Sequence, residues 1–348
     1  MKTIKHFWIL SLLAVVMSCN NSNTTDSQNT KLKALIIDGQ NNHYIWPKTT
    51  LMMRDYLEQT GLFEVSIHRT DQVWLGIKYN AERPGSLEKY YLDYPVDTIS
   101  RSVSPEPIDT LDIDIDFSKY DVIVSNLGAF AAAWPDKTKN KFENYMKEGG
   151  GLVIVHAANN AWGDWDEYNR MIGLGAWGDR DSTTGPYAFY NDKSELELKH
   201  TAGIAGSHGA EHEYHITTRE PEHPIMKDLP LNWLHTKDEL YDRMRGPFVN
   251  ATILATAYAD VEVNEQPWEP KVKGSGWHVP MLMTINYGKG RIFHAVMGHF
   301  DYSMECVGYT TTLQRGTEWA ATGIVSQELP EDFPTKEKTS ARKWSNKN

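Results

Sequence analysis

Three histidines, His43, His156 and His299, lie where predicted strands end. His156 follows the apolar run Leu152–Val155, and His299 follows the mostly apolar run Arg291–Met297. The carboxyl ends of parallel strands meet at one edge of an α/β sheet, and such sheets bind their ligands there. Imidazole can bind a divalent metal or transfer protons. The three positions therefore predict one site, with His156 as a catalytic residue and His43 and His299 as metal ligands.

Two acids and a tyrosine follow one another closely in the stretch Lys237–Tyr241, beside His235. Clustered carboxylate and imidazole groups act as general acids and bases or bind a divalent cation. We therefore assign Asp238, Glu239 and Tyr241 as candidate catalytic residues. Zinc suits imidazole ligands combined with one carboxylate and an open position, so zinc is the expected cofactor. The alternative for this stretch is a solvated helix start with Asp238 as its cap.

A further group of histidines crowds the segment Ser207–His215. His208 and His212 have the four-residue spacing of a helical metal pair. Gly209 and the alternation that follows it favour a loop entering a strand instead, which places alternate side chains on opposite faces. A zinc site made by this segment alone is therefore not expected.

Composition and missing motifs exclude several functions. The chain has no Gly-x-Ser-x-Gly elbow, no phosphate-binding Gly-x-x-x-x-Gly-Lys-Ser/Thr and no Gly-x-Gly-x-x-Gly after its first strand, so no nucleotide cofactor is expected. Lys and Arg total 35 against 46 Asp and Glu, which argues against a nucleic-acid partner. Twelve Trp and 17 Tyr hint at a carbohydrate ligand, since aromatic faces stack on sugar rings, although they also fill cores.

The elements that must position these residues alternate between strands and helices. We expect strands at Lys33–Gly39, Phe63–Ile67, Asp121–Asn126 and Leu152–Val155, a helix starting at Thr49 or Thr50, another at Lys137–Lys147, an irregular excursion over 71–110, a hairpin around Tyr287–Gly290 and a closing helix at Thr310–Ala321. This order predicts an α/β fold with a doubly wound, mainly parallel sheet, extended by loops and a hairpin.

The first 19 residues are typical of a bacterial lipoprotein signal peptide. Lys2 and Lys5 precede the short apolar run Phe7–Met17, and the lipidation residue Cys19 follows it directly. We expect a cell-envelope lipoprotein, periplasmic or associated with the outer membrane, that touches the membrane only through its lipid. The alternative is a plain secretory signal with a chance cysteine. Cys306 is the only other cysteine, so no internal disulfide is expected.

The rest of the chain reads as one domain with polar ends. Residues 20–30 form a polar tether with too little apolar surface to fold. The domain itself covers 31–325, and 326–348 form a polar tail whose last part, from Lys336, we expect to fray.

Short motifs along the chain resemble the ThuA-like (trehalose-utilisation) family, a branch of the class I glutamine amidotransferase-like superfamily. The resemblance runs from about Lys33 to Gly323 and rests on the stretches Asp38–His43, Gly149–Asn160, Met171–Trp177, His223–Ile225, Trp233–His235, Asp238–Tyr241, Arg245–Pro247, Tyr287–Arg291, Gly298–His299 and Glu318–Gly323. It implies a flavodoxin-like three-layer α/β/α fold. It also places His156-Ala157 where the amidotransferases carry the cysteine of their nucleophile elbow, and since this chain has no cysteine there, glutaminase activity is not implied.

The family resemblance links the chain to uptake and oxidative breakdown of disaccharides, including 3-keto-sugars. The leading hypothesis is a hydrolase or lyase without a cysteine nucleophile that acts on a glycoside or 3-keto-sugar by metal- or acid/base-assisted chemistry. The residues expected to hold the sugar are Asn42, Trp46, Asn126, Asn159, Trp162 and Trp177. The alternatives are a non-catalytic sugar-binding lipoprotein and an accessory subunit of a sugar dehydrogenase. A homo-oligomer is compatible with either.

Overall fold

The computed structural model describes residues 30–76 and 86–346, and Lys31–Asn348 form one compact unit. The expected signal peptide with Cys19, and the tether apart from its last residue, lie outside the described residues. Among the helices that the structure describes, none has the length and apolar character needed to cross a membrane.

One half of the main sheet consists of parallel strands. In spatial order these are β14 (Gly290–Ala295), β5 (Gly151–Val155), β4 (Val122–Ser125), β1 (Leu32–Gln40), β2 (Phe63–Trp74) and β3 (Ser102–Ser104). Every residue of β4 and β5 is buried. Their continuous apolar runs are therefore covered on both faces, as expected for inner strands of a parallel sheet.

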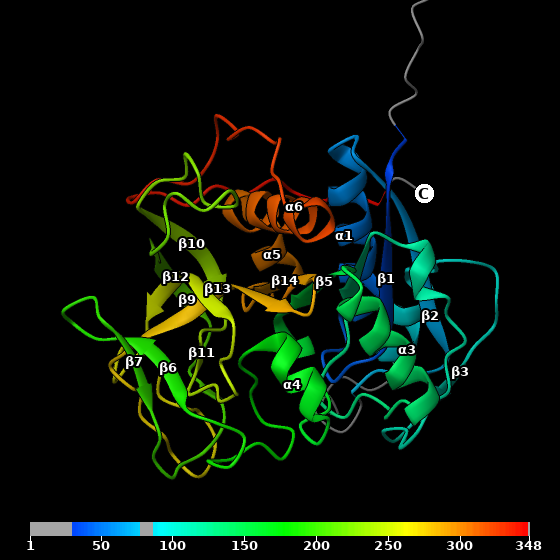
Figure 1. Ribbon diagram of the computed structural model, residues 1–348, viewed down its shortest axis with the longest axis horizontal. Helices are drawn as coiled ribbons and strands as arrows, with labels where there is room; N and C mark the ends of the chain where they lie inside the picture. The colour runs from blue at the N-terminus through cyan, green and yellow to red at the C-terminus, as the bar shows by residue number, and fades with distance from the viewer. Residues whose placement is uncertain (1–29, 77–85, 347–348) are drawn as a thin grey trace, which may run out of the picture. The chain divides into compact units, whose positions relative to one another are not determined.

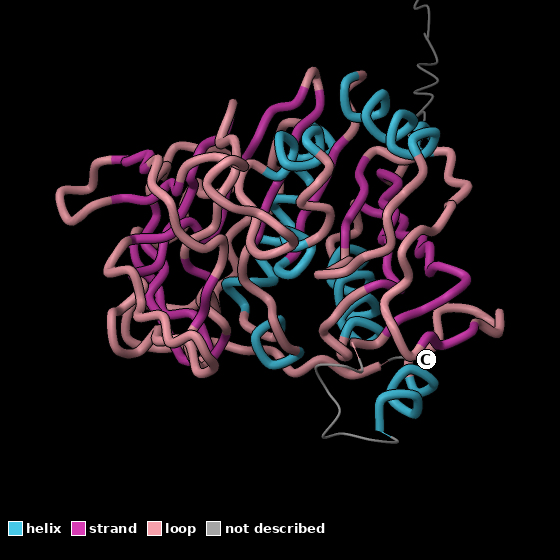
Figure 2. Tube along the Cα trace, turned by 90° about the horizontal axis from the view of Figure 1, so that it is seen from below, coloured by secondary structure: helices cyan, strands magenta, loops and turns pink. Residues whose placement is uncertain are grey.

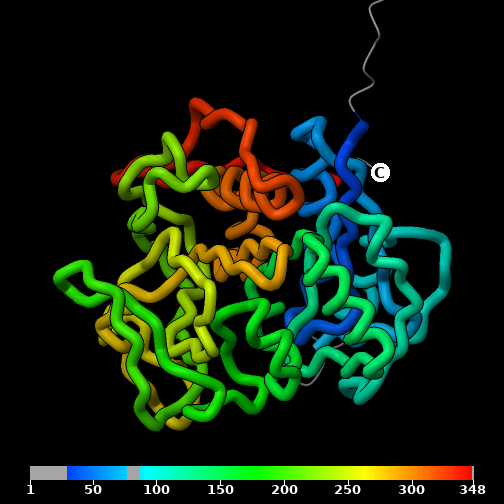
Figure 3. Tube along the Cα trace, viewed as in Figure 1, coloured from blue at the N-terminus to red at the C-terminus, as the bar shows by residue number. Residues whose placement is uncertain are grey.

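The other half of the sheet is antiparallel. From β14 the sheet continues through β13 (His278–Tyr287), β12 (Ala251–Tyr258), β9 (His212–Thr218) and β10 (Asn232–Asp238). A hairpin of β6 (Tyr187–Tyr190) and β7 (Leu196–Lys199) adjoins β13. A separate two-stranded sheet pairs β8 (Ser207–His208) with β11 (Tyr241–Asp242). Figure 3 follows the chain from the blue and cyan parallel strands to the green and yellow antiparallel ones, before β14 returns to the middle. The expected α/β fold is confirmed, and its elaborations are larger than expected.

Helices cover both faces of the parallel half. α1 (Trp46–Gln59), α5 (Asp301–Met304) and α6 (Val307–Thr322) contact one another on one face, and α3 (Asp136–Lys147) and α4 (Asp166–Ile172) lie on the other (Figure 1). The short α2 (Ser86–Asp93) contacts α1. Figure 2 shows most of the helices beside the parallel half, while α5 also contacts β10 and α4 also contacts β13 of the antiparallel half. This arrangement is the expected three-layer α/β/α core.

Some elements differ from the predicted ones. α1 begins at Trp46 rather than at Thr49 or Thr50, because Pro47 fits the first turn of a helix, where its missing N–H is not needed. The excursion over 71–110 contains the end of β2, α2 and β3. Asp238 ends strand β10, so the alternative of a helix start there is wrong.

The end of the chain is not frayed as far as the structure describes it. The Trp344 Nε1 atom donates a hydrogen bond to the Asp55 carboxylate at 2.9 Å, and the Val307 amide donates to the Ser340 carbonyl at 2.9 Å. The buried Phe333 packs against Trp233, with 5.3 Å between ring centroids. The prediction of a frayed tail is therefore wrong up to residue 346.

A buried histidine in β14 links stability to pH. The ring of His294 donates from Nδ1 to the Ile172 carbonyl at 2.9 Å and accepts at Nε2 from the Asn159 amide at 3.1 Å. Burial lowers the pKa of His294 to about 4. Since its unfolded pKa is about 6.5, the stability contributed by the neutral ring is complete above pH 6.5 and is lost as the pH falls towards 4.

Replacing His294 with asparagine should flatten this pH dependence. Asparagine retains a donor for Ile172 but does not titrate. We expect metal-free wild-type protein to lose about 2–3 kcal/mol more unfolding free energy between pH 7 and 4.5 than the variant loses. Urea unfolding at both pH values measures this, with His200→Asn at an exposed position as the control. Equal losses in wild type and variant would contradict the assignment.

Candidate functional site

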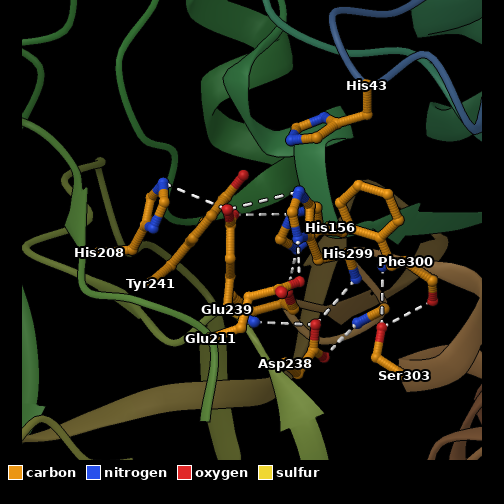
Figure 4. A network of polar contacts seen from close by, with 12 residues as sticks. His43, His156, His208, Glu211, Asp238, Glu239, Tyr241, His299, Phe300 and Ser303 are labelled. Atoms are coloured by element: carbon orange, nitrogen blue, oxygen red, sulfur yellow. Dashed lines mark hydrogen bonds and ion pairs between the residues drawn. The ribbon is translucent and has the colours of Figure 1, made fainter. Parts of the chain in front are cut away.

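Four predicted site residues converge at the carboxyl edge of the parallel strands. His43 follows β1, His156 follows β5, His299 follows β14 and Glu239 follows β10. One ligand atom from each lies within 4.8 Å of the other three. Figure 4 shows the side chains meeting from these separate segments. The structure thus brings together the three histidines that follow strand ends, His43, His156 and His299, with Glu239 from the acid-rich stretch.

The far nitrogen of each imidazole is held by an acceptor. Nδ1 of His156 donates to the Val296 carbonyl at 2.7 Å, and Nδ1 of His299 donates to the Glu211 carboxylate at 2.8 Å. Nδ1 of His43 lies 3.2 Å from the Asn41 side-chain oxygen. Such contacts fix the tautomer and orientation of metal-binding histidines. In the neutral form of each ring, these contacts leave Nε2 facing the cluster as the available ligand atom.

Glu239 is the carboxylate at which these rings meet. Its oxygens lie 3.5 Å from Nε2 of His156 and 3.4 Å from Nε2 of His299. Burial alone would raise the pKa of Glu239, but the neighbouring imidazoles of His299 and His156 lower it below its usual range. Burial, followed by the neighbouring His299 and His156, holds the pKa of His43 well below its usual value. At neutral pH the site therefore contains a carboxylate and a neutral His43.

The donor set fits a divalent cation. Nε2 of His156 and Oε2 of Glu239 are buried without a hydrogen-bond partner among the described residues. Buried polar atoms without partners are costly and rare in proteins, and a cation at this point would satisfy both. Three imidazoles with one carboxylate are ligands that zinc accepts. The residues present therefore fit the expected metal.

A fifth residue, His208 in β8, lies across Glu239 from His156 and His299 (Figure 4). Its Nε2 is 3.4 Å from the Glu239 carboxylate, and its Nδ1 contacts the Gly209 carbonyl at 2.8 Å. Burial lowers the pKa of His208, so its ring is neutral at neutral pH. The sequence signal for His208 was the histidine-rich segment Ser207–His215. His208 joins the site only because Glu239 and the other histidines reach it from distant segments of the chain.

Asp238 lies behind the site rather than in it. Its carboxylate accepts hydrogen bonds from the backbone amides of Glu239 at 2.9 Å, Gly298 at 2.8 Å and His299 at 3.0 Å. It also accepts from Nε2 of His235 at 2.9 Å. Asp238 is fully buried and does not line the pocket described below. The prediction that it is catalytic is therefore corrected, because the side chain positions the site.

His156 adopts a strained backbone. Its φ is 44°, in the left-handed region that costs a non-glycine residue about 1–3 kcal/mol. The 3-10 helix η3 (His156–Asn160) starts at this residue directly after β5. The ring packs against Tyr241, with 4.4 Å between centroids. Strain of this kind persists where the surrounding structure holds it, often at functional sites.

A pocket of about 630 Å³ opens above the cluster. It is lined by Asn42, His43, Tyr44, Ala129, Phe130, Asn160, Trp177, Gly178, His208, Glu239, Tyr241, Trp268, His299 and Phe300. Of the expected substrate-binding residues, Asn42 and Trp177 are in this lining, together with the candidate catalytic Tyr241. The sequence did not predict Tyr44, Phe130, Trp268 and Phe300, because they lie in turns and loops without a recognisable spacing, nor Asn160 at the end of η3.

Two expected stacking residues belong to the core instead. Trp46 is fully buried in α1, and its Nε1 donates to the Trp74 carbonyl at 3.0 Å. Trp162 is buried, donates to the Ala132 carbonyl at 3.0 Å and packs on Trp134, with 4.6 Å between centroids. Neither lines the pocket, so their assignment to sugar binding is corrected.

The same correction applies to two asparagines. The Asn126 amide donates to Oγ1 of Thr49 at 3.1 Å and of Thr50 at 2.8 Å, which fixes the first turn of α1 to β4. The Asn159 amide contacts His294 at 3.1 Å and is fully buried. Both side chains support the fold beneath the pocket.

Comparison with known proteins gives consistent matches. The family model described as trehalose utilisation matches residues 109–320. The chain is 37% identical to a ThuA-like protein of Parabacteroides merdae of known crystal structure, over 90% of this chain and 98% of that one, with a TM-score of 0.72. A ThuA-like protein of Bacteroides uniformis is 16% identical over 85% and 93% of the chains, with a TM-score of 0.49. Curated proteins give no significant match.

Proposed function

This chain belongs to the ThuA-like family of trehalose-utilisation proteins, and we propose that it is a metal-dependent lyase that cleaves 3-keto-glycosides. The observation that carries the proposal is the meeting of His43, His156, His299 and Glu239, with ligand atoms within 4.8 Å of one another at the base of a pocket. The family supplies the sugar context, and the site supplies the chemistry.

The proposed reaction is an elimination that starts from the acidic C–H bond beside the keto group. When bound, a divalent cation would polarise the 3-keto oxygen and so acidify the bond at C2. Nε2 of His208 accepts the C2 proton, and the C–H electrons form a C1=C2 double bond as the C1–O bond breaks. The departing oxygen takes up the phenol proton of Tyr241, and the proton held by His208 returns to Tyr241 through solvent when the products leave. The products are an unsaturated keto-sugar and the free alcohol, without net oxidation.

Tyr241 and His208 have complementary properties for this reaction. Burial raises the pKa of Tyr241 well above its usual value, so the phenol stays protonated. Its oxygen receives a hydrogen bond from the Asn160 amide at 3.4 Å, which leaves the phenol proton for the sugar or the departing oxygen. His208 is neutral and lies outside the group of four ligands. It therefore serves as the base without competing for the metal.

Replacing His208 with glutamine tests this division of roles. We expect kcat to fall about 100-fold, the lower end of the range for general-base catalysis, while the metal content stays the same. Elemental analysis and steady-state kinetics on the same preparation measure both. His212→Gln, at the neighbouring histidine outside the pocket, is the control. Loss of metal in the His208 variant would instead make that residue a ligand.

Metal analysis with product identification tests the proposed function itself. Protein purified without chelators should contain about one divalent ion per chain and should convert a 3-keto-glucoside to a product lighter by one water than the hydrolysis product. Hydrolysis would give the heavier keto-sugar and overturn the elimination. Binding of sugar without any turnover would support the non-catalytic alternative.

The proposal also covers where the protein is located and which reaction supplies its substrate. A lipid at Cys19 would hold the enzyme in the cell envelope, and a sugar-oxidising dehydrogenase would supply the 3-keto-glycoside. Labelled fatty acid should be incorporated into the wild type and not into Cys19→Ser. Incorporation into both would refute the anchor.

A further inference from the structure

We infer that the mouth of the pocket is an aglycone subsite, formed by Phe130 and Trp268, that binds a neutral ring with an apolar face. This inference rests on the proposed function, since it names the leaving group of the same reaction. The ring would be a second sugar residue or an aryl group, which present the same kind of flat apolar surface.

The two aromatic side chains are unusually accessible for their size. Phe130 is 54% exposed and Trp268 is 41% exposed, yet both line the pocket above Glu239. Phe130 lies between β4 and α3 in the parallel half, and Trp268 lies between β12 and β13 in the antiparallel half. Single exposed apolar side chains are common on protein surfaces, but exposed aromatic rings that line a pocket are typical of ligand-binding sites.

Both rings are carried by ordered loops. Phe130 has a φ of 60°, and hydrogen bonds of the preceding residues, including the Ala129 amide with the Asn42 side chain at 2.9 Å, fix its loop. The Trp268 loop is closed by the Gln266 amide, which donates to the Val272 carbonyl at 2.8 Å. Ligand binding to such preformed surfaces costs little ordering entropy.

The position of His208 places the leaving group beside Trp268. The proton that His208 removes is on C2, and the scissile oxygen is attached to the adjacent carbon, C1. The leaving group therefore lies within two bonds of the carbon that faces His208. The ring of Trp268 is 4.7 Å from that of His208, edge to face. A ring attached to the scissile oxygen would thus reach the Trp268 surface.

The charge of the lining restricts the chemistry of the ring. Among the described residues that line the pocket, Glu239 is the only acid and none is a lysine or arginine. These residues therefore offer no cation to pair with a phosphorylated or carboxylated aglycone. Aromatic faces stack on neutral rings, so a glucosyl or aryl group is the expected occupant.

Calorimetric binding of unoxidised glycosides to the whole protein tests the subsite without requiring turnover. We expect phenyl β-glucoside and a glucosyl-glucose disaccharide each to bind about 3- to 10-fold more tightly than methyl β-glucoside. A gain in affinity of this size corresponds to the binding free energy of one stacking contact. Trp268→Ala and Phe130→Ala should each reduce this preference. Tyr258→Ala removes an aromatic ring that is 43% exposed and lies outside the pocket, and it should leave the preference unchanged.

The outcomes separate this inference from the proposed function. A preference that Trp268→Ala and Phe130→Ala remove supports the subsite even if the protein turns over no 3-keto-glycoside. Equal binding of all three ligands, or a preference unaffected by both variants, overturns the subsite even if elimination is observed. Preference for phenyl alone identifies an aryl aglycone, and preference for the disaccharide alone identifies a sugar; either supports the subsite.

Discussion

Glu239→Gln is expected to lower kcat/KM for a 3-keto-glycoside by at least about 1000-fold and to abolish the proposed metal binding. Glutamine has nearly the same shape, but it is neutral and turns an amide N–H towards the imidazoles. The carboxylate lies 3.4–3.5 Å from Nε2 of His156, His208 and His299, so its charge acts on the whole cluster. A lost ligand removes several kcal/mol of transition-state stabilisation, which gives a factor of this size.

Two further variants calibrate that loss. Glu211 orients His299 from behind, so Glu211→Gln should lower metal affinity by about 10- to 100-fold, as is usual for such supporting groups. Glu213 is exposed on β9, and Glu213→Gln should change nothing. Elemental analysis and kinetics rank the three variants. A Glu239→Gln protein that keeps its metal and its turnover would show that the carboxylate is not part of the reaction centre.

The centre of the site was predictable because of a property of parallel sheets. Consecutive buried strands must end at the same edge, so residues directly after them meet, whatever their separation in sequence. His43, His156 and His299 satisfy this condition, and they meet in the structure. Glu239 follows an antiparallel strand, and its assignment came from the acid-rich stretch around it.

The walls of the pocket were not predictable in the same way. Trp162 and Trp268 both lie in loop-rich segments, yet one is buried in an aromatic cluster and the other is 41% exposed at the pocket. The sequence shows that a tryptophan is present but not whether its ring is buried, because the residues that cover it come from distant segments. His208 is similar, because it joins the site through the pairing of β8 with β11. Loop placement depends on tertiary contacts that no local spacing encodes.

Asp238→Asn is expected to weaken metal binding as well as the fold. One carboxylate accepts four hydrogen bonds, three of them from the backbone segments that carry Glu239 and His299. Asparagine can still accept with one oxygen, but its N–H₂ group would face the Gly298 amide and Nε2 of His235. Removing one partner of a buried charged network costs about 3–5 kcal/mol. We expect a loss of that order in unfolding free energy, together with at least about 10-fold weaker metal binding.

Asp242→Asn provides the matched control, because it separates positioning from stability. Asp242 is equally buried, and its carboxylate accepts from the backbone amides of Arg243 at 2.7 Å and Ser275 at 2.8 Å, away from the metal ligands. Its variant should lose stability but retain metal affinity. Chemical unfolding gives the first quantity and metal titration of the folded protein gives the second. If both variants lose stability and both keep their metal affinity, Asp238 supports the fold alone. A selective loss of affinity in Asp238→Asn establishes that the buried carboxylate sets the geometry of the ligands above it.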